Sequence, residues 1–222
     1  MKNHFIIGDV HGCFHTLKNL LEHWKANEHQ LIFVGDLIDH GNNSPQTVAL
    51  IQDIQKKHSD TIILRGNHEQ QFQQHCLNEF NEDWYEKSGE RTFSQYLIHN
   101  RLVDKDAEWF SDFPLYYETP NLLISHAGVC DTDDPFNAES LDGVVWHRNK
   151  IKRLDQLQVY GHTPQDEAIF DAEVNAINID TGAYKANKLT ALLVKNDGSI
   201  LEMIDESTHE EDIPKEKEEE II

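Results

Sequence analysis

Short apolar runs alternate with amphipathic stretches over the first third of the chain. The runs at 5–7, 31–34 and 61–64 are rich in Ile, Leu, Phe and Val, and they predict three buried strands. Apolar residues recur at helical spacing over about 14–26, and Ser44-Pro45 has the composition of a helix start before the third run. The order strand–helix–strand–helix–strand predicts parallel strands joined by right-handed crossovers, as in an α/β fold.

Helices and then strands are predicted beyond residue 65. Helical spacing is found around 93–97 and again from 104 to 109. Strands are then predicted at 115–118, 121–125, 157–160, 175–180, 189–194 and 199–203, with a turn at 195–198 that joins the last two as a hairpin. From residue 205 onward Glu, Asp and Lys dominate. We therefore expect one domain over residues 1–204 and a disordered acidic tail over 205–222.

The composition is that of one ordinary globular domain with a strong negative charge. Forty acidic and 19 basic residues produce a formal net charge of −21, which disfavours nucleic acid and anionic membranes as partners. No run is long enough for a transmembrane helix, and the N-terminus is too short and polar for a signal peptide. Cys13, Cys76 and Cys130 are widely spaced and odd in number, which favours free thiols. We expect a cytoplasmic monomer.

Five small polar clusters follow apolar runs, and each combines glycine with Asp, Asn or His. They are GDVHG (8–12), GDLIDHG (35–41), GNHE (66–69), SHAG (125–128) and YGHTP (160–164). In open α/β sheets, ligands bind just outside the carboxyl ends of the strands, so these five loops should meet at one edge of the fold. A single histidine or Gly-Asp pair is ordinarily a surface or core feature, but five such clusters after strands are hard to explain by chance.

The clusters offer oxygen and imidazole ligands and no thiolate. Asp9 and His11 are two residues apart, so in an extended segment both side chains point to the same side. A mixed oxygen and nitrogen set suits Mn, Fe, Zn or similar ions and disfavours a structural cysteine–zinc site. Six candidates are more than one catalytic ion needs, and they favour a two-metal centre bridged by a carboxylate. The candidate metal ligands are Asp9, His11, Asp36, Asn67, His126 and His162.

The ordered motifs resemble those of the calcineurin-like metallophosphoesterases, and most closely their phosphoprotein phosphatase branch, with its small bacterial and phage enzymes. The resemblance covers about residues 5–194 and rests on GDVHG, GDLIDHG, LRGNHE, HAG and GHTP, together with VVWHRN (144–149) and INIDTGA (177–183). It implies a four-layer α/β/β/α sandwich, in which helices flank two sheets. Bacterial diadenosine tetraphosphate hydrolases share HAG, YGHTP and NIDTG-like segments, so the motifs do not specify the substrate.

The resemblance also implies roles for individual residues. One ion would be held by Asp9, His11 and His162 with Asp36, and the other by Asn67 and His126, with Asp36 bridging the two. His68 would be the catalytic histidine and Asp39 its carboxylate partner, while Arg148, Asn67 and His40 would contact the substrate phosphate. Two divalent metal ions are the expected cofactors, with Mn first and Fe, Zn, Ni or Co as alternatives.

The expected activity is hydrolysis of phosphomonoesters in a phosphorylated protein, at Ser/Thr and also at Tyr, or in a small phosphoester. A metal-bound hydroxide would attack phosphorus directly, and His68 would protonate the leaving group. Hydrolysis of dinucleoside polyphosphates such as diadenosine tetraphosphate is the alternative. A non-catalytic metal-binding module is the third interpretation, and the intact ligand set argues against it.

His40 departs from the family pattern, which reads Gly-Asp-x-x-Asp-Arg-Gly and uses the arginine to bind phosphate. Histidine is shorter than arginine and is neutral through much of the physiological pH range. Three interpretations stay open. His40 is a weaker clamp supported by Arg148 and the metals, or a clamp that works only when protonated, or part of a pocket reshaped for another substrate.

Overall fold

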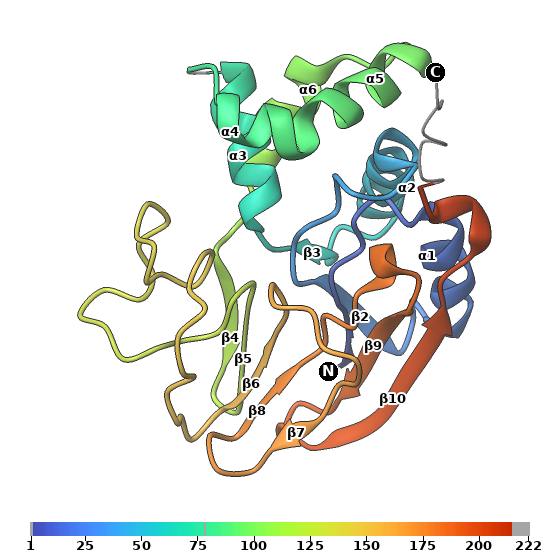
Figure 1. Ribbon diagram of the computed structural model, residues 1–222. Coiled ribbons are helices and arrows are strands. Elements are labelled where there is room, and N and C mark those ends of the chain that lie inside the picture. Colours follow the sequence, from blue (N-terminus) through green and yellow to red (C-terminus); the bar gives the residue numbers. More distant parts are fainter. Residues whose placement is uncertain (1, 78, 215–222) are drawn as a thin grey trace.

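Two mixed five-stranded sheets stack against each other in the computed structural model, which describes residues 2–77 and 79–214 (Figure 1). The first sheet has the order β10–β9–β1–β2–β3, and the second has the order β4–β5–β6–β8–β7. The predicted α/β sandwich of two sheets with helices is therefore confirmed. None of the described helices has the length and apolar character that a bilayer-spanning helix needs.

The first sheet combines distant parts of the chain. Its strands are β1 (Asn3–Ile7), β2 (His29–Phe33), β3 (Ile62–Ile63), β9 (Lys188–Val194) and β10 (Ile200–Ser207). The strands β1, β2 and β3 are parallel, as the alternation of strands and helices predicts, and β9 pairs with β1 in the antiparallel direction. The hairpin of β9 and β10 closes the other edge of this sheet.

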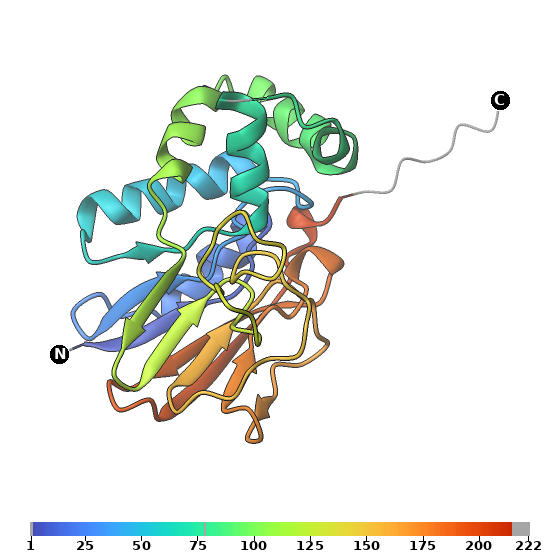
Figure 2. The ribbon, with the colours of Figure 1, turned by 90° about the vertical axis from the view of Figure 1, so that its left-hand side faces the viewer.

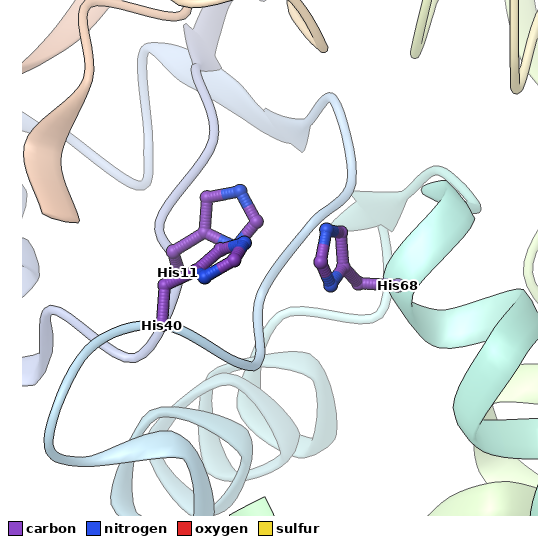
Figure 3. A group of neighbouring side chains, drawn as sticks. All are labelled: His11, His40 and His68. Atoms are coloured by element: carbon purple, nitrogen blue, oxygen red, sulfur yellow. The ribbon is translucent and has the colours of Figure 1, made fainter. Parts of the chain in front are cut away.

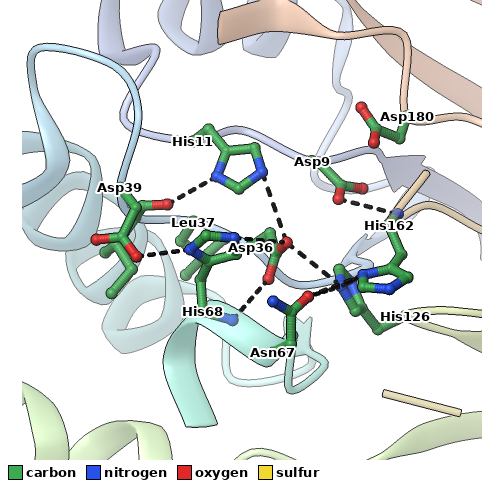
Figure 4. Close-up of polar contacts among 12 residues, drawn as sticks. Asp9, His11, Asp36, Leu37, Asp39, Asn67, His68, His126, His162 and Asp180 are labelled. Carbon is green, nitrogen blue, oxygen red and sulfur yellow. Dashed lines mark hydrogen bonds and ion pairs between the residues drawn. The ribbon is translucent and has the colours of Figure 1, made fainter. Parts of the chain in front are cut away.

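The second sheet is built from one continuous stretch of the chain, residues 116–178. Its strands are β4 (Tyr116–Thr119), β5 (Leu122–Ser125), β6 (Leu157–Tyr160), β7 (Phe170–Asp171) and β8 (Ala176–Asn178). The strands β5, β6 and β8 are parallel, so their carboxyl ends lie at one edge. This edge adjoins the carboxyl ends of β1, β2 and β3, which brings the polar loops of both sheets together (Figure 4).

The helices gather on one side of the molecule (Figure 2). They are α1 (Phe14–Leu20), α2 (Ser44–Lys57), α3 (Asn67–Leu77), α4 (Glu82–Trp84), α5 (Glu90–Ile98) and α6 (Val103–Ser111), with a π-helical turn, Tyr85–Gly89, between α4 and α5. The hydrophobic pattern does not predict α3, because few apolar residues mark its buried face. This helix nevertheless begins at Asn67 and so positions two of the predicted site residues.

The alternation of side chains along β1 divides the core into two layers. Phe5 and Ile7 pack with the helices, whereas Ile6 lies between the sheets with apolar residues of β5 and β6. On the outer face of the second sheet, Leu123 packs with Val144 and Val145. These two valines belong to the 126–156 segment, which contains turns and an isolated bridge but no helix, so a loop covers this face.

The prediction of a disordered tail from residue 205 is wrong for the residues that the structure describes. Residues 205–207 complete strand β10, and a single 3-10 turn follows at Glu210–Asp212. The Asp212 carboxylate is fully buried and accepts hydrogen bonds from the Thr16 backbone N–H (2.8 Å), the Thr16 hydroxyl (2.7 Å) and the Asn43 amide (3.0 Å). One acid among many thus anchors the segment to the start of α1, which composition alone cannot reveal. Residues 215–222 lie outside the described part.

Candidate metal centre and active site

The predicted site residues converge at the carboxyl ends of the strands (Figure 4). Asp9 and His11 follow β1, and the loop after β2 carries Asp36, Asp39 and His40. The start of α3 carries Asn67 and His68, while His126 follows β5 and His162 follows β6. Two sheets and one helix therefore contribute to one cluster, as the position of the five polar motifs predicts.

The loop after β2 has an unusual backbone that turns its acids inward. Asp36, Asp39 and His40 have φ values of 51°, 71° and 56°, in the left-handed region that residues other than glycine seldom adopt. The buried Glu69 carboxylate holds this conformation by accepting hydrogen bonds from the backbone N–H groups of Asp36 (2.8 Å) and Leu37 (2.7 Å). Glu69 belongs to the GNHE motif, yet its sequence position alone does not reveal this structural role.

Four side chains on the His126 side present lone pairs to a common point. His126 Nδ1 donates to the Val34 carbonyl (3.1 Å) and His162 Nε2 donates to the Trp146 carbonyl (3.0 Å), so in the neutral form of each ring the other nitrogen is an acceptor. These two nitrogens, His126 Nε2 and His162 Nδ1, face each other at 3.1 Å. The Asn67 Oδ1 atom lies 3.0 Å from His126 Nε2 and 2.8 Å from His162 Nδ1.

Facing acceptors repel each other unless a proton or a metal cation lies between them. Asp36 Oδ2, at 3.3 Å from His126 Nε2, adds a negative charge to the same point. Burial and the neighbouring His126 lower the pKa of His162 to about 3, so this ring is neutral at physiological pH and free to act as a ligand. Asp36, Asn67, His126 and His162 therefore fit one divalent ion with two oxygen and two nitrogen donors.

A second group of ligands shares Asp36. Asp9, His11 and Asp36 place donor atoms within 4.8 Å of one another, and His11 Nδ1 donates to the Ile38 carbonyl (2.8 Å), which leaves Nε2 as the acceptor. Asp9 Oδ1 is buried and has no hydrogen-bond partner among the described residues. Burial, together with the nearby Asp180 and Asp36, raises the pKa of Asp9 well above its usual value, because no positive charge compensates this carboxylate.

His162 belongs to the His126 group, and its predicted place beside Asp9 and His11 is wrong. The loop that carries His162 follows β6, which lies next to β5 in the second sheet, so the ring of His162 lands beside His126. Only its backbone N–H reaches the other group, where it donates to Asp9 Oδ2 (3.0 Å). Sequence spacing cannot distinguish the two positions, since both lie at the same edge of the fold.

His68 and Asp39 form the predicted pair, and two further residues support it. His68 Nδ1 lies 2.6 Å from Asp39 Oδ2, and the same carboxylate accepts hydrogen bonds from Trp84 Nε1 (2.7 Å) and from the Thr92 hydroxyl. Asp39, Trp84 and Thr92 are all buried. The helical segment α4–α5 thus fixes the carboxylate that orients His68, and no motif in the sequence points to Trp84 or Thr92.

The surroundings of His68 favour its protonated form. Burial alone would lower the pKa of His68, but the carboxylates of Asp36 and Asp39 outweigh burial and raise the pKa to about 9. The Nε2 atom lies 3.9 Å from Asp36 Oδ2, so it is close to the shared ligand of the two groups. An imidazolium in this position can donate a proton to a leaving group that departs beside the metals.

Arg148 and His40, the predicted phosphate contacts, lie on different sides of the centre. The exposed Arg148 donates to the His162 carbonyl (3.2 Å) and to the Thr163 hydroxyl (3.0 Å), which places its guanidinium at the rim of the His126 group. His40 stacks on Tyr184, with ring centroids 4.4 Å apart and planes inclined at 19°. Burial and the neighbouring His68 lower the pKa of His40 to about 4, so His40 is neutral near pH 7 in the metal-free protein.

Comparison with known proteins identifies the family of the chain. A family model described as calcineurin-like phosphoesterase matches residues 5–197. A relative from Oceanobacillus iheyensis, named bis(5'-nucleosyl)-tetraphosphatase PrpE (asymmetrical), is 28% identical over 227 residues, which cover 84% of this chain and 86% of the relative.

Solved structures share the fold at lower identity. The crystal structure of a candidate diadenosine tetraphosphatase has a TM-score of 0.66 at 21% identity, over 94% of this chain and 95% of that chain. A protein serine/threonine phosphatase from Saccharomyces cerevisiae has a TM-score of 0.60 at 17% identity, over 94% of this chain and 80% of that chain. Both similarities concern the architecture, and they add no evidence on the substrate.

Proposed function

The chain belongs to the calcineurin-like phosphoesterase family, and from this premise we propose that it hydrolyses dinucleoside tetraphosphates with two divalent metal ions. The observation that supports the metal centre is the convergence of His126 Nε2 and His162 Nδ1 on the oxygens of Asn67 and Asp36. The observation that supports the substrate is the name of relatives that align over 84% of the chain at 28% identity. Asymmetrical cleavage of such a substrate yields a nucleoside triphosphate and a nucleoside monophosphate.

The chain's own residues define how such a reaction would proceed. Divalent ions in the two groups would activate a water and neutralise phosphate oxygens, and Mn is the ion that we propose, with Fe, Zn, Ni and Co as alternatives. Arg148 offers a planar fork to the phosphate oxygens at the rim. His68 carries the proton for the departing oxygen, and Asp39 keeps its ring in the required orientation.

A phosphorylated protein is the second candidate substrate. The motif GDLIDHG, with its Asp39–His68 pair, supports this reading, because a strong general acid helps most when the leaving group is an alkoxide such as serine. His40 argues against it, since the phosphatase pattern has arginine at this position and His40 is neutral near pH 7 in the metal-free protein. Hydrolysis of a dinucleotide, whose phosphate leaving group is less basic, depends less on a general acid.

A substrate panel tests the proposal. Metal-stripped protein is reloaded separately with Mn, Mg, Zn, Ni and Co and assayed on diadenosine tetraphosphate, a phosphoserine peptide, a phosphotyrosine peptide and p-nitrophenyl phosphate. We expect ATP and AMP as the products of the dinucleotide, with a higher kcat/KM than for either peptide. The Asp36→Asn protein, purified in parallel, serves as the control for contaminating phosphatases. Faster turnover of a phosphopeptide would overturn our first choice, and no turnover of any substrate would favour the non-catalytic module.

A further inference from the structure

Three imidazole rings meet beside the proposed metal centre (Figure 3). His11 follows β1, His40 lies in the loop after β2, and His68 belongs to the first turn of α3. The ring centroids are 4.7 Å apart for His11 and His40, 4.8 Å for His11 and His68, and 4.9 Å for His40 and His68. One nitrogen from each ring can be chosen so that the three atoms lie within 4.8 Å of one another.

Edge-to-face packing of aromatic rings needs no ion. Whether this cluster can bind one therefore depends on the hydrogen bonds that its ring nitrogens already make. His11 Nδ1 bonds to the Ile38 carbonyl and His68 Nδ1 to Asp39, so each ring keeps its Nε2 atom for a further ligand. The His40 ring makes no hydrogen bond within the described part of the chain, while Tyr184 stacks on one of its faces and fixes its plane. The His40 ring therefore offers nitrogens that no described residue uses, whereas the Nε2 atoms of His11 and His68 are those that the proposed function assigns to the metal centre and to the departing oxygen.

His11 is common to two alternative ligand sets. Asp9, His11 and Asp36 offer two carboxylates and one imidazole, whereas His11, His40 and His68 offer imidazole nitrogens alone. Carboxylate oxygens suit Mn and Mg, and imidazole nitrogens suit Zn, which forms bonds of about 2.0–2.1 Å to three histidines in known catalytic sites. The three rings would have to move closer together to form such bonds with one ion. His11 could bind only one of the two ions at a time.

We propose that His11, His40 and His68 form an alternative zinc position that competes with the Asp9–His11–Asp36 position of the metal centre. A zinc ion in this position takes the Nε2 lone pair of His68, and the proton that this atom would carry is released to solvent. Zinc would then inhibit the enzyme while manganese supports it. The inhibitory consequence rests on the proposed function, but the zinc position itself does not.

A competition experiment without substrate tests the position. Zinc is titrated into the manganese-loaded protein, and released manganese is followed through the EPR signal of the free aqueous ion. Because His11 cannot bind both ions, we expect one manganese ion to leave for each zinc ion that binds. The His40→Asn variant should need at least about tenfold more zinc, since even indirect changes around a metal site cost 10–100-fold in affinity. Asparagine is the chosen replacement because it tolerates the φ of 56° at this position.

The control is His23→Asn, which removes an exposed histidine from outside the cluster and should behave like the wild type. His40→Gln provides a second replacement, and circular dichroism establishes that each variant is folded. Equal zinc requirements for wild type and both His40 variants would overturn the proposal, because zinc would then be replacing manganese at the carboxylate-rich position. So would a wild-type protein that releases no manganese.

Zinc inhibition provides the second readout. For each variant the rate is expressed relative to its own zinc-free rate, and we expect inhibition to weaken in the His40 variants by the same factor as zinc binding. If the protein hydrolyses none of the proposed substrates, the manganese-release experiment still decides the zinc position. If it hydrolyses them and zinc inhibits independently of His40, the proposed function stands and this inference fails.

Discussion

Replacing Trp84 by phenylalanine removes one of the groups that hold Asp39 in place. Trp84 Nε1 donates to Asp39 Oδ2 at 2.7 Å, and both residues are buried, so water cannot replace the lost donor. A hydrogen bond to a charged group contributes about 1.5–3 kcal/mol. The smaller ring also leaves a void beside Phe72 and Phe93, which costs about 1 kcal/mol.

The free energy of unfolding should therefore fall by about 2.5–4 kcal/mol. For a chain of this length, each kcal/mol of lost stability lowers Tm by about 2–4 °C, so the Tm of the variant should fall by about 5–16 °C. The variant should still fold, because domains are stable by about 5–15 kcal/mol. With one donor gone, the Asp39 carboxylate attracts the His68 proton more strongly. The high-pH limb of the kcat profile, which reports loss of the general acid, should then move to higher pH.

Trp109→Phe is the matched control. Trp109 is half-buried, and its Nε1 atom donates to the neutral Gln55 side chain at 3.0 Å, far from the site. A neutral hydrogen bond contributes about 0.5–1.5 kcal/mol, so the loss of stability should be smaller, and the pH profile of kcat should not move. Calorimetry and a pH–rate series on both variants provide the data. Equal destabilisation of the two variants, with no shift of the limb for Trp84→Phe, would refute the role assigned to Trp84.

Three further substitutions test separate parts of the account. His68→Asn should retain metal and lower kcat by about 10²–10⁴-fold on an alkyl phosphate but less on p-nitrophenyl phosphate, and equal losses on both would argue against a general acid. Gly161→Ala places a Cβ atom 1.9 Å from Asp9 Oδ1, which forces the Asp9 carboxylate to move. Manganese affinity, measured by equilibrium dialysis, should therefore drop. An unchanged affinity would argue against Asp9 as a ligand. Asp212→Asn should lower stability in urea by about 1.5–3 kcal/mol, whereas the exposed Glu210→Gln should have almost no effect, and similar values for both would contradict the buried anchor.

The sequence predicts most of the strands, and the edge at which the candidate ligands meet, because both depend on local order. A short apolar run must be buried, and a polar cluster directly after it must lie at the end of a strand, as Asp9 and Asp36 do. The same reasoning places His126 and His162 at the shared edge. It cannot assign His162 to one ion, because that depends on which strands of the second sheet are neighbours.

Contacts between distant segments account for what the sequence does not predict. Trp84 and Thr92 follow Asp39 by 45 and 53 positions in the sequence, yet both side chains contact it. They lie on helices whose packing the local pattern does not specify. Asp212 binds the start of α1 across 196 positions, although its neighbours have the composition of a solvated tail. In each case a buried polar contact with a distant segment decides the local structure, and the composition of the neighbouring residues does not predict it.

The central claim is that Asp36 is shared by two metal ions, and metal counting on Asp36→Asn tests it most directly. Asparagine keeps the size of the side chain and removes the charge that faces His126 at 3.3 Å and His11 at 3.5 Å. Wild type and variant are stripped, dialysed against the same manganese solution and analysed by plasma mass spectrometry. The account predicts about two ions per wild-type chain, as in a carboxylate-bridged two-metal centre, and fewer than about one in the variant. Two ions retained by the variant, with hydrolysis intact, would contradict it.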